Sequence, residues 1–295
     1  MSADRTRWVV RPGTAPGLDA RDPADTSGAP GGKHATQTTF AALSDTLLDL
    51  QERLYAESAR SLLVVLQAMD AGGKDGTIKH VFRGLNPQGV RVTSFKAPTP
   101  QELEHDFLWR IAKAAPAHGR IGIFNRSHYE EVIALRVHPE WLAAQRLPTG
   151  PEHPGFWEER YEDINAFERH LARTGTTIVK FFLNVSKAEQ KRRFLARLDD
   201  AQREWTFNAD DVAERRHWDE YIAAYEAALT ATSTPWAPWY VIPADHKSLT
   251  QALVAAILVH TIDGLDLRWP TMAPGAHEAN VAARRALEAE QPIPA

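Results

Sequence analysis

Apolar positions follow two patterns that alternate along the chain. Short runs rich in β-branched and aromatic residues predict strands at 61–69, 90–96, 120–125, 177–185 and 239–244. Between these runs, helical spacing of apolar residues predicts helices at 74–84, 100–115, 128–136, 156–173, 187–198, 210–230 and 247–263. Such alternation is typical of an α/β fold with a parallel sheet that helices cover on both faces. Ligands of these folds bind at the carboxyl ends of the strands.

The two ends of the chain lack this alternation. Residues 1–36 are rich in Gly, Pro, Ala, Asp and Arg and predict an extended or disordered arm. Residues 266–295 predict a tail, in which 281–289 favours a short helix, so that one domain occupies 37–265.

A stripe of apolar residues precedes the first predicted strand. These residues recur at spacings of three and four and predict an amphipathic helix: Phe40, Leu43, Leu47, Leu50 and Leu54. The stripe either packs within its own domain or contacts a second copy of the chain. On the second interpretation we expect a homo-oligomer, a dimer or a tetramer.

Composition excludes several classes of function. The 295 residues have 34 Lys and Arg against 38 Asp and Glu, a net charge of −4, which argues against a nucleic-acid-binding protein. The absence of cysteine excludes disulfides, thiolate metal sites and cysteine nucleophiles. No apolar run approaches the roughly 18 residues that span a bilayer, and the start of the chain lacks a signal-peptide pattern. We therefore expect a cytoplasmic protein without a membrane partner.

The segment after the first strand, QAMDAGGKDGT at 67–77, predicts a phosphate-binding loop. In a strand, glycine-rich turn and helix, backbone N–H groups and the helix N-terminus face an anion, and the lysine reaches a phosphate. The match to G-x-x-x-x-G-K-[ST] is imperfect, because Ala68 replaces the first glycine and Asp75 replaces the hydroxyl residue that usually binds magnesium. Asp70 is the natural substitute ligand, with Asp75 as a second candidate. Because similar turns occur without any phosphate, the loop alone leaves both interpretations open.

The third strand leads into IFNRSHYEE at 123–131. Asn125 stands where phosphate-loop proteins commonly have a magnesium-supporting acid, and Arg126 offers a bidentate donor for phosphate. Glu130 lies about one helical turn further on and can return a carboxylate to the cation. The structural alternative is a strand end capped by asparagine, with Arg126 and Glu130 paired on the surface.

Charge is unevenly distributed along this acidic chain. Residues 74–96 have five basic residues against one acidic, residues 178–197 have six against one, and residues 198–226 have nine acidic residues against three basic. Cations concentrated near strand ends favour a polyanionic ligand, although solvated helix faces give the same pattern. Arg193 and Arg197 lie four apart before a polar stretch, which is typical of a mobile lid at about 190–215.

Six segments resemble the polyphosphate kinase 2 family, in order and at family-like spacing over about 40 to 265. They are AMDAGGKDGTIKHVF, GLNPQGVRVTSFKAPT, HDFLWRI, IGIFNRSHYEEV, FLNVSKAEQKRRFLARLDD and TSTPWAPWYVIPADHK. The resemblance implies a three-layer α/β/α P-loop kinase fold related to thymidylate kinase, with a helical lid. It also implies phosphoryl transfer between inorganic polyphosphate and adenine nucleotides with Mg²⁺, for which Mn²⁺ can substitute.

The resemblance also assigns site residues. We expect catalytic roles for Asp70, Lys74, Arg126 and Arg193, and the resemblance implies metal binding by Asp70; metal binding by Glu130 is our own hypothesis. The residues that we expect to bind phosphate or nucleotide are Gly72, Gly73, Lys74, Asp75, Gly76, Thr77, Lys79, Arg83, Asn86, Lys96, Asn125, Arg192 and Arg197.

The string NRSHYEEV at 125–132 resembles the class III branch, which phosphorylates AMP as well as ADP. The ADP- or GDP-dependent branches typically have Asp at the position of Asn125, Trp at that of His128 and Asn at that of Glu130. Our hypothesis is that Glu130 replaces the missing aspartate in positioning magnesium. An ATP-dependent nucleoside monophosphate kinase and an inactive polyphosphate- or nucleotide-binding module are the alternatives.

Overall fold

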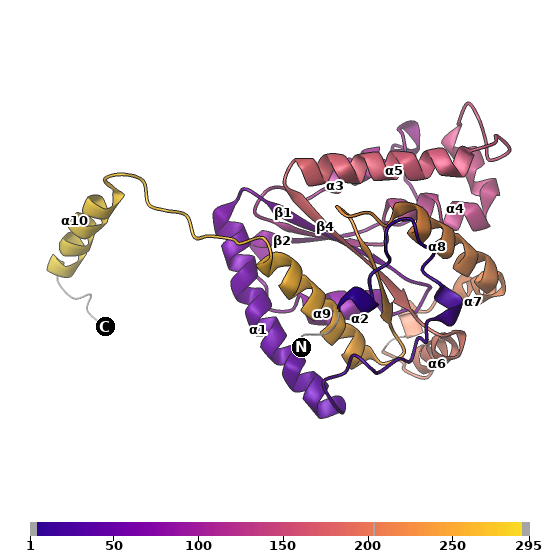
Figure 1. The fold of residues 1–295 in the computed structure, drawn as a ribbon, viewed down its shortest axis with the longest axis horizontal. Coiled ribbons are helices and arrows are strands. Elements are labelled where there is room, and N and C mark those ends of the chain that lie inside the picture. The colour runs from indigo at the N-terminus through magenta and orange to yellow at the C-terminus, as the bar shows by residue number, and fades with distance from the viewer. Residues whose placement is uncertain (1–4, 203, 291–295) are drawn as a thin grey trace.

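The computed structural model describes residues 5–202 and 204–290 and has a five-stranded sheet at its centre (Figure 1). The strands are β1 Ser61–Gln67, β2 Val90–Ser94, β3 Ile121–Asn125, β4 Thr176–Asn184 and β5 Trp239–Pro243. Their order is β2-β3-β1-β4-β5, and all four neighbouring pairs are parallel. Every residue of β1 is buried, as expected of a strand in the middle of a covered sheet. The predicted α/β fold is confirmed.

Helices cover both faces of the sheet. The α-helices of the described residues are α1 Lys33–Glu57, α2 Lys74–Val81, α3 Trp109–Ala114, α4 Ala134–Val137, α5 Phe156–Arg173, α6 Lys187–Leu198, α7 Asp210–Glu214, α8 Trp218–Thr232, α9 Lys247–Asp263 and α10 Ala276–Ala289, and α10 does not cover the sheet. Helices α1 and α2 pack against α9 on one face, and α5 packs against α8 and β4 on the other (Figure 1). In the described part of the chain, no helix is long and apolar enough to cross a membrane.

Three predicted helices are shorter than their apolar patterns suggest. The segment 100–115 begins with a 3-10 turn, Glu102–Glu104, and becomes α-helical only at Trp109, after a turn in which the Asp106 carboxylate accepts the N–H of Leu108 at 2.9 Å. The segment 128–136 begins as a 3-10 turn, His128–Glu131, that Ser127 caps by accepting the N–H of Tyr129. The segment 210–230 is interrupted between α7 and α8 by the 3-10 turn Arg215–His217.

The leucine stripe packs within its own chain. Leu47, Leu50 and Leu54 are buried in the core, and Phe40 and Leu43 pack against it. Helix α1 lies along α9, which supplies the apolar surface that the stripe covers (Figure 1). Since the stripe is used inside the domain, it no longer supports a contact with a second copy.

The N-terminal segment lies beside the edge strand β5. Val9 forms an antiparallel bridge with Tyr240, and Trp8 is buried. Backbone N–H groups of Gly17 and Leu18 donate to the Glu226 carboxylate on α8 at 2.8 and 2.9 Å. Of the predicted arm, residues 1–4 lie outside the described residues, and α1 already begins four residues before the predicted domain. The division into arm, domain and tail stays a prediction.

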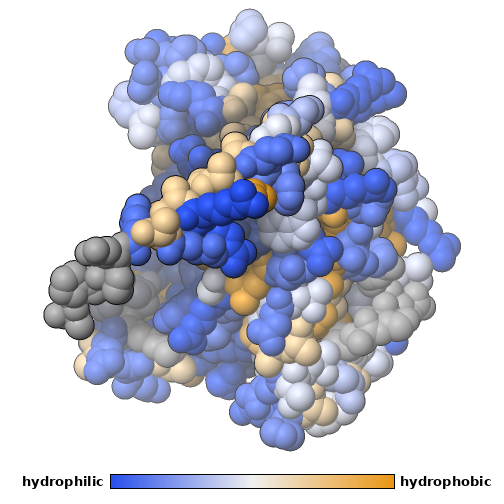
Figure 2. Space-filling model, turned by 90° about the vertical axis from the view of Figure 1, so that its left-hand side faces the viewer, coloured by the Kyte–Doolittle hydropathy of each residue, from blue (hydrophilic) through white to orange (hydrophobic). Residues whose placement is uncertain are grey.

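The C-terminal helix α10 stands apart from the rest of the fold (Figure 1). It spans Ala276–Ala289, five residues more at its start than the predicted helix, and none of its residues is buried. Figure 2 looks onto this end of the molecule, where hydrophilic side chains predominate and smaller apolar patches lie between them. Residues 291–295 of the predicted tail, and residue 203 of the predicted lid, lie outside the described residues.

A fully buried ion pair connects the sheet to α5. Lys180 in β4 donates to Glu168 at 2.6 Å and to the Tyr129 hydroxyl at 2.7 Å, and Glu168 also accepts from Tyr129 at 2.8 Å. Burial opposes the charge on Glu168, but Lys180 and His128 hold its pKa below the usual value. Lys180 therefore belongs to the core. In the sequence analysis it was one of the cations of the basic segment 178–197, which favoured a polyanionic ligand.

We expect Lys180→Met to lower the free energy of unfolding by about 3–5 kcal/mol, because the substitution leaves the Glu168 carboxylate buried without its partner. Denaturant unfolding monitored by circular dichroism measures this change. The matched control is Lys33→Met, at an exposed position in α1. Equal unfolding midpoints for the two variants would contradict a structural role for the pair.

Candidate active site

The carboxyl ends of the strands bring the predicted site segments together. Leu66 in β1 pairs with Asn125 in β3, so the loops that follow these two strands leave the sheet side by side. Leu66 also pairs with Phe181 in β4, and Asn184 near the end of β4 pairs with Pro243. The three segments after β1, β3 and β4 therefore face one edge of the sheet.

The loop after β1 turns tightly around Gly72 and Gly73. Gly73 has φ +105°, and Ala71 has φ +55°, so the chain reverses through left-handed backbone. A Cβ on Gly72 would lie 2.6 Å from the Ala68 Cβ and 2.7 Å from the Met69 oxygen, which leaves no room for a side chain. These contacts explain why the sequence places glycines here and why α2 begins directly at Lys74.

The side chain of Lys74 folds back onto the glycine-rich loop. The side chain is buried, and Nζ donates to the Ala68 oxygen at 2.8 Å. Burial and, after it, the neighbouring Arg126 guanidinium lower the pKa of Lys74 to about 8, against the opposing effect of Asp70. An arriving phosphate supplies the negative charge that favours the protonated amine, so anion binding and the charge on Lys74 support each other.

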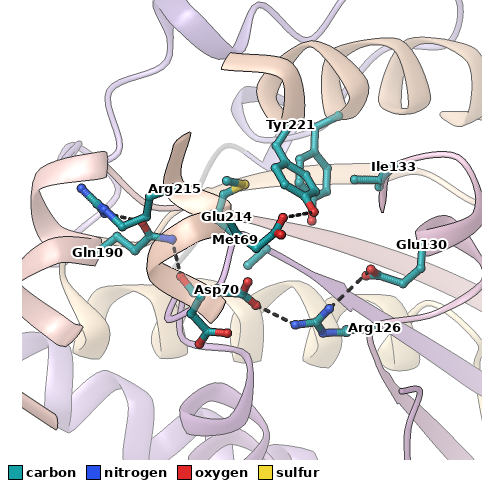
Figure 3. Close-up of a pocket in the computed structure, with 12 residues that line it drawn as sticks. Met69, Asp70, Arg126, Glu130, Ile133, Gln190, Glu214, Arg215 and Tyr221 are labelled. Atoms are coloured by element: carbon teal, nitrogen blue, oxygen red, sulfur yellow. Dashed lines mark hydrogen bonds and ion pairs between the residues drawn. The ribbon is translucent and has the colours of Figure 1, made fainter. Parts of the chain in front are cut away.

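Arg126 bridges the two carboxylates predicted to bind metal (Figure 3). Its Nη2 donates to Asp70 Oδ1 at 2.6 Å, and its Nη1 donates to Glu130 Oε2 at 3.5 Å. Glu130 raises the pKa of Arg126 most, burial opposes this, and Asp70 adds to it, so the guanidinium stays charged. Arg126 has φ +60°, a strained conformation that its N–H supports by donating to the Leu66 oxygen at 3.1 Å.

The amide of Asn125 points toward the glycine-rich loop. Its Nδ2 donates to Asp75 Oδ1 at 2.7 Å, and the Ser94 oxygen lies 3.4 Å from the same nitrogen. Asp75 is thus directed toward Asn125, whereas Glu130 accepts from the Gln67 amide at 3.1 Å on the other side of Arg126.

The first turns of α6 hold the loop in place. Arg193 is buried and donates to the oxygens of Ala71, at 2.9 Å, and Ala244. Gln190 donates to the Asp70 oxygen at 2.8 Å. In this arrangement Arg193 contacts the backbone of two loops, so its charge lies directly behind the glycine-rich turn.

The other predicted lid arginines lie further out. Arg192 is exposed and pairs with Glu189 at 2.6 Å, and the Arg197 guanidinium lies over the Phe194 ring at 5.7 Å. Neither residue lines the pocket around Asp70.

Several predicted phosphate-binding residues lie away from that pocket. Lys79 and Arg83 are exposed, on α2 and just after it, and Thr77 is buried in α2 beside Gly76. Asn86 caps a turn by accepting the N–H of Gln88 at 3.0 Å. Lys96 lines a separate hollow at the end of β2, with Arg91, Arg110 and Lys113. Binding roles for these residues remain predictions.

The pocket around Asp70 includes side chains that the sequence did not single out. Besides Asp70, Arg126 and Glu130, it is lined by residues from α6, α7 and α8 and the turn between α7 and α8 (Figure 3). These are Gln190, Asp211, Glu214, Arg215, Tyr221 and Tyr225. The acidic composition of 198–226 was the available signal, since it contains Asp211 and Glu214, but nothing in the sequence directed either of them toward this pocket.

Comparison with known proteins identifies the family. Residues 32–269 match the sequence profile of the family described as polyphosphate kinase 2. The chain belongs to the polyphosphate kinase 2 family. The resemblance predicted from the sequence is confirmed, and the chain is an enzyme of the phosphotransferase type with a P-loop kinase fold.

Two curated relatives of this family cover most of the chain. An AMP/ADP-polyphosphate phosphotransferase of Meiothermus ruber is 50% identical over 264 residues, which are 90% of this chain and 95% of that protein. An ADP-polyphosphate phosphotransferase of Rhodopseudomonas palustris is 46% identical, over 82% of this chain and 84% of that protein. The crystal structure of polyphosphate kinase 2 from Arthrobacter aurescens superposes with a TM-score of 0.85 at 43% identity, covering 94% and 95% of the two chains.

Proposed function

We propose that this polyphosphate kinase 2 enzyme transfers phosphoryl groups reversibly from inorganic polyphosphate to AMP and ADP, giving ADP and ATP. The supporting observation is the position of Glu130, which faces the pocket across Arg126 from Asp70 (Figure 3). Glu130 is one of the three positions, with Asn125 and His128, at which the sequence resembles the AMP-phosphorylating branch. The Meiothermus ruber relative, whose name includes both AMP and ADP, supports the same acceptors.

The reaction requires charge neutralisation more than proton transfer. The acceptor oxygen of AMP or ADP is already anionic near neutral pH, so no strong general base is needed. Two polyanions must approach each other, and their repulsion is the main barrier. Lys74, the N–H groups of the glycine-rich loop and the guanidinium of Arg126 provide the opposing charge, and Arg193 adds charge from behind the loop.

Magnesium fits the donor set of this pocket. Within the described residues no three carboxylate or histidine side chains converge as a complete metal cage. Mg²⁺ commonly takes only one or two carboxylates and completes its shell with water and substrate phosphates. Asp70 and Glu130 are the carboxylates that we propose for this role, and the ion would neutralise phosphate charge there. Arg126, which pairs with both carboxylates, can then turn its donors toward phosphate.

We expect Glu130→Gln to raise the Mg²⁺ concentration needed for half-maximal rate and to lower AMP turnover by about 10-fold or more, because the amide keeps the shape but loses the charge. Magnesium titrations with AMP and with ADP as acceptor measure both effects. Glu220→Gln, at an exposed position in α8, is the matched control. If AMP turnover and magnesium dependence are both unchanged, Glu130 has no role in positioning the ion.

A comparison of acceptors tests the proposed function. Purified enzyme is supplied with long-chain polyphosphate, Mg²⁺ and either AMP, ADP or GDP, and nucleotide products are separated by chromatography. Phosphorylation of both AMP and ADP supports the proposal, whereas turnover of ADP or GDP without AMP contradicts the assignment to the AMP-using branch. A cytoplasmic location and a homo-oligomer are also proposals. Light scattering of the purified enzyme tests the second.

A further inference from the structure

Tyr225 lines the active-site pocket and has a hydroxyl without a hydrogen-bond partner in the described part of the chain. The residue lies on α8, is only 3% exposed, and lines the same pocket as Asp70, Arg126 and Glu130. Its ring packs against Phe182 of β4, with 4.3 Å between the ring centroids. Among the residues that the structure describes, no group forms a hydrogen bond with the Tyr225 hydroxyl.

By comparison, the hydroxyls of two other tyrosines, Tyr129 and Tyr221, both form hydrogen bonds. The Tyr129 hydroxyl donates to Glu168 at 2.8 Å and accepts from Lys180 at 2.7 Å. Tyr221, one helical turn before Tyr225, donates to Glu214 at 2.8 Å (Figure 3). The Tyr225 hydroxyl is not among the fully buried polar atoms that lack a hydrogen bond, so it is accessible from the pocket rather than sealed in the core. Because it forms no hydrogen bond within the described part of the protein, the Tyr225 hydroxyl is a donor available to a ligand that binds in this pocket.

We propose that the Tyr225 hydroxyl donates a hydrogen bond to a non-bridging oxygen of the phosphoryl group in transfer, which makes Tyr225 a catalytic residue. The inference rests on the proposed function, since it takes the phosphoryl group to enter this pocket. Nothing in the quoted family segments includes Tyr225, which lies between the fifth and the sixth of them.

The electrostatics of the pocket favour a neutral donor at this position. Burial, and next to it the Glu130 carboxylate, hold the pKa of the Tyr225 hydroxyl well above its usual value, so it keeps its proton at physiological pH. The lining includes four carboxylates but only two guanidiniums, and Arg126 already serves two of those carboxylates. A neutral hydroxyl donates to a phosphate oxygen without adding negative charge to this surplus.

The hydroxyl transfers no proton in this role. A P–O bond of the polyphosphate anhydride breaks, and a P–O bond to the anionic oxygen of AMP forms. The products are ADP and a polyphosphate chain that is one phosphate shorter. The phenolic O–H is retained throughout and stabilises charge on the equatorial oxygens, where it is spread in the transition state.

The test is Tyr225→Phe, which removes only the oxygen. A hydrogen bond to a charged group that is made mainly in the transition state predicts a fall in kcat of about 10- to 100-fold. We expect the KM for AMP to stay within about twofold, because the contact is stronger in the transition state than in the bound substrate. The melting temperature stays close to that of wild type, since the hydroxyl that is removed forms no hydrogen bond with any described residue.

Tyr129→Phe is the matched control, because it removes a hydroxyl with two buried partners and is expected to lower the melting temperature. Three results with Tyr225→Phe would overturn the proposal: a kcat within about twofold of wild type, a change in the KM for AMP alone, or a melting temperature lowered as far as in the control. Wild-type enzyme is assayed beside the variants. If it is inactive with polyphosphate and AMP, the proposed function fails and this inference fails with it.

Discussion

Lys74→Ala is expected to reduce turnover with polyphosphate and AMP by about 1000-fold while the protein still folds. Lys74 is the buried cation of the glycine-rich loop, and its ammonium donates to the Ala68 oxygen at 2.8 Å. When a phosphate binds, the same ammonium offsets the charge that develops during transfer, which is typically the largest catalytic contribution in phosphoryl transfer. Steady-state kinetics with saturating AMP measure the loss.

Two controls separate this effect from unfolding. Lys33→Ala removes an exposed lysine of α1 outside the site and is expected to keep wild-type turnover. Thermal unfolding of Lys74→Ala shows whether the loop still folds, which we expect because the Gly72–Gly73 turn and Arg193 hold it independently of the lysine. Retention of more than about a tenth of the activity would contradict a role for Lys74 in charge neutralisation.

Asp70→Asn is expected to lower turnover by about 100- to 1000-fold at millimolar Mg²⁺. The amide keeps an oxygen near Arg126 but removes the negative charge that attracts the cation. The ion pair of 2.6 Å between Asp70 and Arg126 is also weakened, so Arg126 loses one of the two carboxylates that orient it. A magnesium titration of the rate measures the change.

Asp219→Asn, at an exposed position in α8, is the matched control for the loss of one carboxylate. We expect it to leave both the rate and the magnesium dependence unchanged. An Asp70→Asn enzyme with the magnesium dependence of wild type would show that the ion does not depend on this carboxylate, and the proposed metal site would be wrong.

Local motifs explain why much of the fold and part of the site were predictable. The glycine-rich loop and the Asn125–Arg126 segment each combine a buried strand with the residues that follow it, and the parallel register then brings the two segments together. Lys74 and Arg126 were predictable from the sequence because each comes soon after the end of a strand. The position of the strand end, rather than a contact with a distant element, places each of them in the site.

Residues whose role depends on distant contacts were missed or misplaced. Asp211 and Tyr225 line the pocket from α7 and α8, which the turn at Arg215–His217 separates, and the apolar pattern does not indicate this interruption of the predicted 210–230 helix. Lys180 looked like a phosphate-binding cation, but its partner Glu168 lies on another element and makes the pair part of the core. The leucine stripe gave no information on its partner, since α9 and a second copy would present similar apolar surfaces.

The most direct test of polyphosphate-dependent AMP phosphorylation is an assay of purified enzyme with AMP and long-chain polyphosphate as the only substrates and Mg²⁺ as the only metal. We predict that ADP appears first and ATP follows. We also predict that Lys74→Ala forms both nucleotides far more slowly than the wild-type enzyme. The result that would contradict this prediction has two parts. Neither ADP nor ATP forms from AMP and polyphosphate, and ADP does form when ATP replaces polyphosphate as the donor.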